Sequence, residues 1–292
     1  MKGTTAMRLS CADYSFPLLP YDVNLALIKG LEFDAVDVAV FSGNPNNSAE
    51  DVIADPTGAG RRIKAMTDDA GLVVADVFPI VITDFRPVFD VQSAAPNNPS
   101  AEVRRQARDD FRRFIEFTLV LESPGLTILP GCPFEDSRTD RDWGLATEEL
   151  AWRVQVAEEA GLELGFEPHI GSITETPEVT AQFVAEVPGL KVCLDLAHFI
   201  YQGISQERIE MLLPISRHHQ VRQAADGVMQ AISYEGTIDI KRLVRKLIAM
   251  DYDGFIAAEY VWMQKWACDR VDNLCETIYV RNQVREALAS PA

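Results

Sequence analysis

The sequence of 292 residues has no apolar run of the length that a membrane crossing needs, about 18 residues or more. Its first residues, 1–6, are polar and lack the apolar stretch of a secretory signal, so we expect a flexible leader there. The five cysteines never occur as Cys-x-x-Cys, which argues against a disulfide framework and a thiolate zinc site. Cys11 and Cys193 fall in apolar runs and are predicted core residues. These absences favour a cytoplasmic protein.

Positive charge is also scarce. The chain has 27 basic and 44 acidic residues, which gives a net charge of −17. Nucleic acids and anionic membranes attract proteins with a positive face, so this balance argues against either as a partner. The main basic cluster, Arg104–Arg113, also carries Asp109 and Asp110, and apolar residues recur there at intervals of three and four. That spacing predicts an amphipathic helix with a solvated face.

Short apolar runs alternate with helical patterns along the whole chain. Eight runs are predicted strands, spaced on average about 35 residues apart, which suits repeated β-loop-α units. No linker divides the chain, and 47% hydrophobic residues can fill a large core, so we predict one (β/α)8 TIM barrel over 7–292. The predicted strands are Met7–Tyr14, Ala35–Phe41, Leu72–Val81, Leu126–Leu129, Leu162–Phe166, Lys191–Asp195, His218–Arg222 and Gly254–Tyr260.

A doubly wound open sheet is the alternative fold. It normally carries a Gly-x-Gly-x-x-Gly turn after the first strand, and none is present. The nearest segment, Pro56–Arg61, falls between the second and third runs and is interpreted as a turn or packing feature. Longer loop-like segments, 85–100 and 130–144, follow the third and fourth runs, where a cover for an active site is expected.

Helix ends are marked by local signals. Ser48, Thr147 and Thr176 each precede acidic residues and are predicted N-caps, and a proline follows Thr176 at the first helical position. Gly71 and Gly161 follow helical segments directly and are predicted to end them in the left-handed conformation.

Side chains that could form a reactive site follow the last four predicted strands. Glu167, Asp195 and Glu259 stand at three strand ends, and residues 218–220 supply a neutral ligand on the fourth. In a barrel, the carboxyl ends of all strands converge on one mouth. Three carboxylates would repel one another without a cation, and oxygen ligands favour Mn²⁺ or Mg²⁺ over zinc. The pattern therefore predicts a divalent metal site.

All four histidines lie in or beside the same strands: His169, His198, His218 and His219. A single histidine would most simply be a core or loop residue that bonds to a backbone carbonyl. The grouping of all four beside the carboxylates favours a shared site, although separate structural roles remain an alternative.

In their order along the chain, these motifs resemble those of the xylose-isomerase-like TIM barrel superfamily. This superfamily includes sugar isomerases, sugar epimerases and barrels similar to the apurinic endonucleases of family 2. The likeness runs from about Met7 to the last predicted helix and is strongest over Gly165–Trp262. It rests on Glu-Pro-His at 167–169, Leu-Asp-x-x-His-Phe at 194–199, His-x-Gln-x-Arg at 218–222 and Glu-Tyr at 259–260.

The resemblance implies that Glu167, Asp195 and Glu259 bind a divalent metal, with Mn²⁺ preferred and Mg²⁺ or Co²⁺ as alternatives. Gln220 occupies the position of the family's metal-binding histidine and is assigned as the fourth ligand through its amide oxygen. His219 would need a shift of register, because alternate residues of a strand point to opposite faces.

The implied reaction is isomerisation or epimerisation of a small ketose through removal of an α-proton and a metal-stabilised enediolate. Glu167 and Glu259 would act as base and acid on opposite faces of the sugar. His198 and Arg222 would orient substrate oxygens, although an ion pair with a carboxylate is an equal alternative for Arg222. His169, His218 and Trp262 are the expected substrate-binding residues. Trp262, Phe199, Tyr201 and Tyr260 would stack on a sugar or an aromatic aglycone, or pack in the core.

Three alternatives stay open. Elimination from the same enolate would make the protein a lyase or dehydratase of a keto sugar or keto-glycoside. A degraded metal site at Gln220 would leave a sugar-binding protein or partner subunit. An apurinic endonuclease needs a histidine-rich trinuclear zinc site and a positive face, and four histidines with a charge of −17 supply neither. The resemblance also implies a homo-oligomer, with a heteromer as the alternative.

Overall fold

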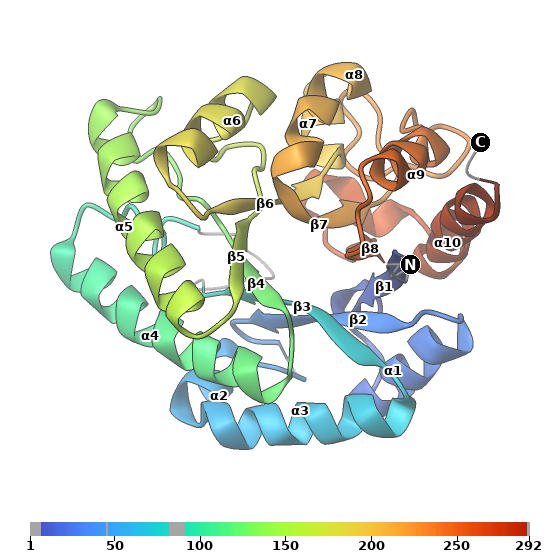
Figure 1. The fold of residues 1–292 in the computed structure, drawn as a ribbon, viewed down its shortest axis with the longest axis horizontal. Coiled ribbons are helices and arrows are strands. Elements are labelled where there is room, and N and C mark those ends of the chain that lie inside the picture. The colour runs from blue at the N-terminus through green and yellow to red at the C-terminus, as the bar shows by residue number, and fades with distance from the viewer. Residues whose placement is uncertain (1–6, 45, 82–90, 291–292) are drawn as a thin grey trace.

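A closed barrel of eight parallel strands, in the order β1 to β8, forms the centre of the protein (Figure 1). The computed structural model describes residues 7–44, 46–81 and 91–290, so the predicted leader and the first part of the loop at 85–100 lie outside the described residues. The (β/α)8 prediction is confirmed, and each predicted strand is present with its ends moved by two residues at most. The strands are β1 (Arg8–Ala12), β2 (Ala35–Phe41), β3 (Val73–Ile80), β4 (Gly125–Ile128), β5 (Glu163–Phe166), β6 (Lys191–Asp195), β7 (Ser216–Val221) and β8 (Phe255–Ala258).

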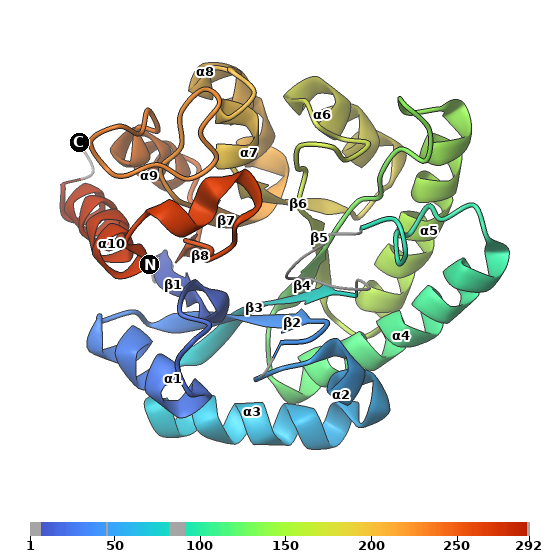
Figure 2. The same ribbon diagram turned by 180° about the vertical axis from the view of Figure 1, so that it is seen from behind.

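Helices surround the barrel on its outer side, as the two opposite views show (Figure 1, Figure 2). The predicted amphipathic helix is α4, which buries Phe111, Phe114 and Phe117. None of the helices in the described part of the chain is both long and apolar enough to cross a membrane. The helices are α1 (Tyr21–Gly30), α2 (Ala49–Ala54), α3 (Pro56–Ala70), α4 (Ala101–Val120), α5 (Asp140–Glu159), α6 (Pro177–Glu186), α7 (Ala197–Ile200), α8 (Gln206–Ile209), α9 (Ile240–Ala249), α10 (Asn273–Ala289), and the 3-10 helices η1 (Asp13–Ser15), η2 (Glu210–Ile215) and η3 (Lys265–Arg270).

Several helix boundaries follow the predicted caps. The side chains of Ser48 and Thr176 accept backbone hydrogen bonds at the starts of α2 and α6, and Gly71 ends α3 with a φ of 70°. The interpretation of Pro56–Arg61 as a turn is wrong, because Asp55 caps a helix that begins at Pro56. The packing role is correct for Gly60 in this segment, because an added Cβ would lie 2.8 Å from Val120 on α4.

The predicted N-cap at Thr147 is also wrong. Thr147 lies inside α5, where its hydroxyl donates to the carbonyl of Trp143, and the helix begins seven residues earlier at Asp140. The true N-cap is Thr139, which forms a capping box with Asp142: each side chain accepts a hydrogen bond from the other residue's backbone N–H. The loop expected at 130–144 is therefore shorter than predicted.

Substituting Thr139 tests this assignment. We expect Thr139→Ala to lower the free energy of unfolding by about 1 kcal/mol, because the first turn of α5 loses its side-chain acceptor. Thr147→Ala is the matched control, and it should change stability by less than about 0.5 kcal/mol, since alanine suits a helix interior. Urea unfolding of both variants decides the matter, and equal effects would contradict the boundary.

The interior of the barrel below its mouth is polar. His218 Nε2 lies 2.7 Å from Asp37 Oδ2, and the guanidinium of Arg217 donates to Asp76 Oδ1 at 2.8 Å. Both acidic residues are 1% exposed or less. Gly125 makes room for Arg217, because an added Cβ would lie 2.7 Å from its Nη2 atom. These two buried ion pairs fill the lower part of the barrel and leave the mouth for other side chains.

Candidate active site

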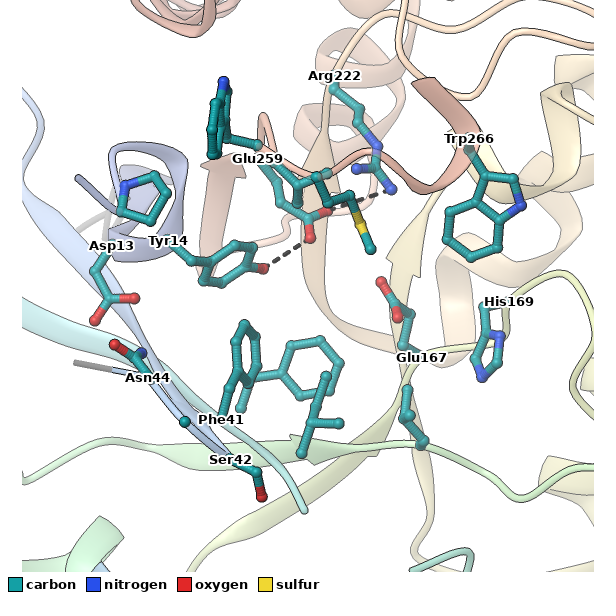
Figure 3. Close-up of a pocket in the computed structure, with 18 of the residues that line it drawn as sticks. Asp13, Tyr14, Phe41, Ser42, Asn44, Glu167, His169, Arg222, Glu259 and Trp266 are labelled. Carbon is teal, nitrogen blue, oxygen red and sulfur yellow. Dashed lines mark hydrogen bonds and ion pairs between the residues drawn. The ribbon is translucent and has the colours of Figure 1, made fainter. Parts of the chain in front are cut away.

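Four neighbouring strands carry the predicted site residues to the mouth of the barrel. Glu167 follows β5 and its N–H donates to the carbonyl of Ile128 on β4, while Asp195 is the last residue of β6. Glu259 follows β8 in the same way, with its N–H donating to the carbonyl of Val221 on β7. Figure 3 shows Glu167, Glu259 and the Arg222 guanidinium facing one space. Parallel strands that end at one level thus bring together carboxylates that are far apart in the sequence.

Two of the carboxylates, those of Glu167 and Asp195, are close enough to share one cation with His198. Ligand atoms of Glu167, Asp195 and His198 all lie within 4.8 Å of one another. His198 Nε2 is 3.7 Å from Glu167 Oε1 and 3.7 Å from Asp195 Oδ2. All three side chains are buried, and Asp195 is 0% exposed.

Arg222 links two of the carboxylates. Its Nη2 atom donates to Asp195 Oδ2 at 2.6 Å and lies 4.0 Å from Glu259 Oε2. The ion pair that the sequence left as an alternative for Arg222 is therefore formed. The same Nη2 atom is 3.4 Å from His198 Nε2, so the guanidinium lies next to every member of the cluster except Glu167.

Burial and mutual repulsion disfavour the charged forms of these acids. Burial raises the pKa of Glu167 well above its usual range, and the charges of Glu259 and Asp195 add to the effect. Burial also raises the pKa of Glu259 to about 7, although the positive charge of Arg222 opposes the shift. Burial and the charge of Arg222 lower the pKa of His198 well below its usual range, so the ring is neutral at neutral pH. A positive charge placed among these groups would relieve the repulsion.

The donor set fits a divalent cation. Glu259 Oε2 is buried without a hydrogen-bond partner in the described structure, which is costly unless a cation or a ligand satisfies it. Carboxylate oxygens of Glu167, Asp195 and Glu259 suit Mg²⁺ or Mn²⁺, and a neutral imidazole such as that of His198 suits Mn²⁺.

The amide of Gln220 is already engaged. Its Nε2 donates to the Tyr14 hydroxyl at 3.0 Å, and its Oε1 accepts from the thiol of Cys193 at 3.3 Å. The structure therefore places the neutral His198 nitrogen beside Glu167 and Asp195, and places the predicted fourth ligand, Gln220, beside Tyr14.

A family model described as xylose isomerase-like TIM barrel matches residues 25–279. The chain belongs to this family. No curated protein matches the chain by sequence. Solved structures of similar fold include one described as L-ribulose 3-epimerase, with a TM-score of 0.75 and 15% identity over 98% of this chain and 95% of that chain.

Two further solved structures resemble this member of the xylose isomerase-like family. A xylose isomerase-like TIM barrel protein from Mycobacterium smegmatis in complex with magnesium has a TM-score of 0.71 and 14% identity, over 100% of this chain and 99% of that chain. A probable 3-DHS dehydratase from Bacillus anthracis has a TM-score of 0.68 and 14% identity, over 94% of this chain and 99% of that chain. At such identities the likeness establishes the shared fold.

Tyr14 is a site residue that the sequence reasoning missed. It lies in η1, directly after β1, and its hydroxyl donates to Glu259 Oε1 at 2.7 Å (Figure 3). The Gln220 amide donates to the same hydroxyl, which fixes the direction of the Tyr14 proton towards Glu259. The predicted first strand ended at Tyr14, so the rule that strand ends meet at the mouth of a family barrel would have found it.

The four histidines do not form one group. His169 and His198 line the cavity, and burial lowers the pKa of His169 to about 4, so this ring is neutral and its Nδ1–H donates to the Ile170 carbonyl. His219 points out of the barrel and packs edge-on against Tyr252. His218, which we predicted to bind substrate, is 1% exposed, bonds to Asp37 and does not line the cavity. It lies deeper in the barrel than Arg222, which directly follows the same strand, β7.

The aromatic residues near the site divide in the same manner. Trp262 lines the cavity and is 52% exposed, as the prediction for a substrate-binding residue requires. Phe199 and Tyr260 are fully buried in the core, and Tyr201 packs against it, so core packing is correct for these three.

Proposed function

We propose that the protein is a divalent-metal-dependent epimerase or isomerase of a keto sugar. The observation that carries the proposal is the pair of buried carboxyl groups, Glu167 and Glu259, that face one cavity from the ends of β5 and β8. A carboxyl group within reach of a substrate carbon can both accept and return a proton. Epimerases and a magnesium-bound relative among proteins of the same fold support this assignment.

In this proposal Glu167 and Glu259 exchange protons with the carbon beside the substrate carbonyl, one on each face of the sugar. Tyr14 orients the Glu259 carboxyl through its hydrogen bond. Arg222 and the neutral rings of His198 and His169 contact substrate oxygens. Glu167, Asp195 and Glu259, with His198 or Gln220 as a fourth ligand, would hold Mn²⁺, Mg²⁺ or Co²⁺, which when bound would supply positive charge for the substrate oxygens as the proton leaves.

A dehydratase or lyase is the second candidate. Proton removal by the same carboxyls, followed by loss of a leaving group at the next carbon, yields an unsaturated product in place of an epimer. A probable dehydratase of the same fold supports this outcome.

The first test is the amount of metal bound per chain. After chelator treatment and reloading with Mn²⁺ or Mg²⁺, we expect plasma mass spectrometry to find about one ion per wild-type chain and none in the double variant Glu167→Gln/Asp195→Asn. Glu178→Gln, at an exposed ion pair with Arg208, is the matched control and should keep its ion. Absence of an ion from the wild type would overturn the metal-dependent mechanism and favour a binding or partner role.

The second test is proton exchange in D₂O. With the reloaded protein and a set of ketopentoses and ketohexoses, an epimerase incorporates deuterium at one carbon and forms the epimer. A dehydratase instead releases a leaving group, and mass spectrometry of the products separates the two. Exchange with none of the sugars, in a protein that binds its ion, would contradict action on free ketoses.

Replacing Gln220 by histidine probes the fourth ligand. If Gln220 occupies the ligand position, Gln220→His should tighten Mn²⁺ binding by about tenfold, which corresponds to about 1.4 kcal/mol, because imidazole is the stronger donor. Titration calorimetry measures the change. Weaker or equal binding would show that Gln220 serves to hold Tyr14, and would assign the neutral ligand to His198.

A further inference from the structure

The cavity at the barrel mouth has two unlike sides. The carboxylates, His169, His198 and Arg222 form one side. The other, which we term the aromatic wall, consists of Tyr14, Phe41, Phe78, Ile80 and Leu129. Figure 3 shows Phe41 on the opposite side of the Tyr14 ring from Glu259. Asp13, Ser42 and Asn44 line the cavity beside this wall (Figure 3). A ligand therefore meets the carboxylates and cationic or imidazole groups on one side, and a hydrocarbon surface bordered by three polar side chains on the other.

The aromatic wall is continuous with the reactive carboxylates. The ring centroids of Tyr14 and Phe41 are 5.2 Å apart, and those of Phe41 and Phe78 are 6.1 Å apart in an edge-to-face arrangement. Tyr14 belongs to both sides, because its hydroxyl bonds to Glu259 while its ring packs on Phe41. A substrate held at Glu259 thus has its neighbouring atoms over hydrocarbon, where hydroxyl groups would lose hydrogen bonds.

The cavity is larger than a simple ketose needs. Its volume is about 720 Å³, whereas a ketohexose has only about twelve non-hydrogen atoms. Volumes of about 300–1,000 Å³ are typical of sites for larger ligands with substantial apolar surface. A sugar alone would leave the aromatic wall in contact with water.

The rim of the cavity is also apolar. Trp262 and Leu18, 52% and 77% exposed, both line the cavity. Trp266 lines it too, with a φ of 57° that residues other than glycine rarely adopt. Strained backbone of this kind is concentrated at ligand sites. The apolar surface therefore extends from the Glu259 carboxylate to the entrance.

We propose that the substrate is a carbohydrate that carries an uncharged aromatic group, such as an aryl keto-glycoside. The sugar lies at the carboxylates and the aromatic group lies on the aromatic wall, towards Trp262. Phe41 and Phe78 pack edge to face. A third aromatic ring can add the same kind of contact to this pair, whereas a flexible alkyl chain cannot. The five residues of the aromatic wall carry no charge, and the carboxylate of the neighbouring Asp13 is already engaged by hydrogen bonds from Tyr21, Asn47 and the Ala39 N–H, so we infer that the bound group is neutral. This inference rests on the proposed function only in assuming that the part of the substrate at the carboxylates is a sugar.

Binding of two unreactive probes tests it. Phenyl β-D-glucopyranoside and methyl β-D-glucopyranoside have no carbonyl and differ only in the aromatic group. With the magnesium-loaded protein, titration calorimetry should show at least about tenfold tighter binding of the phenyl glucoside, because the ring leaves water for the aromatic wall. Equal affinities, or no binding of the phenyl glucoside up to its solubility limit, would overturn the proposal.

Substitutions in the cavity test which residues cause the preference for the phenyl glucoside. Trp262→Ala and Phe78→Leu should each weaken binding of the phenyl glucoside by at least threefold more than binding of the methyl glucoside. Tyr234→Ala is the matched control, because Tyr234 is 84% exposed and does not line the cavity. Trp262 is at the surface, so its variant should fold normally, and an unchanged melting temperature verifies this. Equal weakening of both probes would overturn the assignment of the aromatic wall.

The proposed reaction and the proposed aromatic substrate can be refuted independently of each other. A protein that exchanges the α-proton of free ketoses but shows no preference for the phenyl glucoside refutes the aromatic substrate and keeps the proposed reaction. A protein that prefers the phenyl glucoside but exchanges no proton, with free ketoses or with phenyl 3-keto-glucoside, refutes the reaction and keeps the aromatic site.

Discussion

If the protein is the proposed epimerase, Glu259→Gln should lower the rate of epimerisation by about 10²–10⁴-fold, the usual loss when a general acid or base is removed. The amide has nearly the shape of the carboxyl and can still accept the Tyr14 hydrogen bond, so the fold should be retained. Glu167→Gln should cause a loss of the same order. The turnover number of each variant with the best ketose from the exchange screen measures the effect, and circular dichroism verifies folding.

The two variants should also differ from each other. If Glu167 and Glu259 serve opposite faces of the sugar, each variant loses epimerisation but keeps deuterium exchange with one of the two epimers. Exchange measured with both epimers distinguishes this arrangement from a single carboxyl that acts on both faces. In the single-carboxyl case one variant would lose all exchange and the other would lose little. Glu178→Gln serves again as the control with an unchanged rate.

Asp76→Ala should lower the free energy of unfolding by about 3–5 kcal/mol, because it removes the buried partner of the Arg217 charge and leaves only the exposed Glu163 carboxylate, 3.8 Å from Arg217 Nε. The Arg217 side chain is 3% exposed, and its Nη1 donates to Asp76 Oδ1 at 2.8 Å. The variant also removes the acceptor of the Thr127 hydroxyl. Since whole domains are stable by about 5–15 kcal/mol, this loss is a large part of the total. Urea unfolding followed by circular dichroism measures it.

A surface ion pair provides the comparison. Glu178→Ala breaks the pair with Arg208, in which both side chains are about half exposed, and should cost less than about 1 kcal/mol. The double variant Asp76→Leu/Arg217→Met should recover much of the stability lost in Asp76→Ala, because apolar residues of similar size often replace a buried pair without loss. An Asp76→Ala variant as stable as Glu178→Ala would contradict the role of the buried pair.

The sequence predicts the barrel well because strands buried on both faces appear as apolar runs. The run Leu162–Phe166, for example, is followed directly by Glu167, and the run Lys191–Asp195 ends at Asp195; both carboxylates reach the mouth. The sequence does not show in the same way how deep an inward-pointing side chain lies within the barrel. His218 on β7 and Arg222 directly after it both point inward, yet His218 bonds to Asp37 deep in the barrel and Arg222 bonds to Asp195 at the mouth. The alternation of residues along a strand predicts which side chains point into the barrel. It does not predict how far each of them lies from the barrel mouth.

The local sequence signals for the start of a helix are ambiguous where tertiary packing determines the helix boundary. Thr139 and Thr147 both precede acidic residues and both resemble N-caps. The helix passes through Thr147 because Ala146 and Leu150 on either side of it are fully buried, so continued helix gains apolar contact there. The contact between Tyr14 and Glu259 joins residues 245 positions apart, and only the closed barrel brings them together.

The closure of the barrel constrains the order in which the protein can form during synthesis. β1 pairs with β8 through Arg8 and Phe255, which are 247 residues apart. At about 5–20 residues per second, the ribosome needs about 12–50 s to make the intervening chain. During this time one edge of β1 has no partner, and an exposed strand edge can pair with other chains. Chaperone binding to nascent chains that end before residue 255 should therefore be greatest at β1.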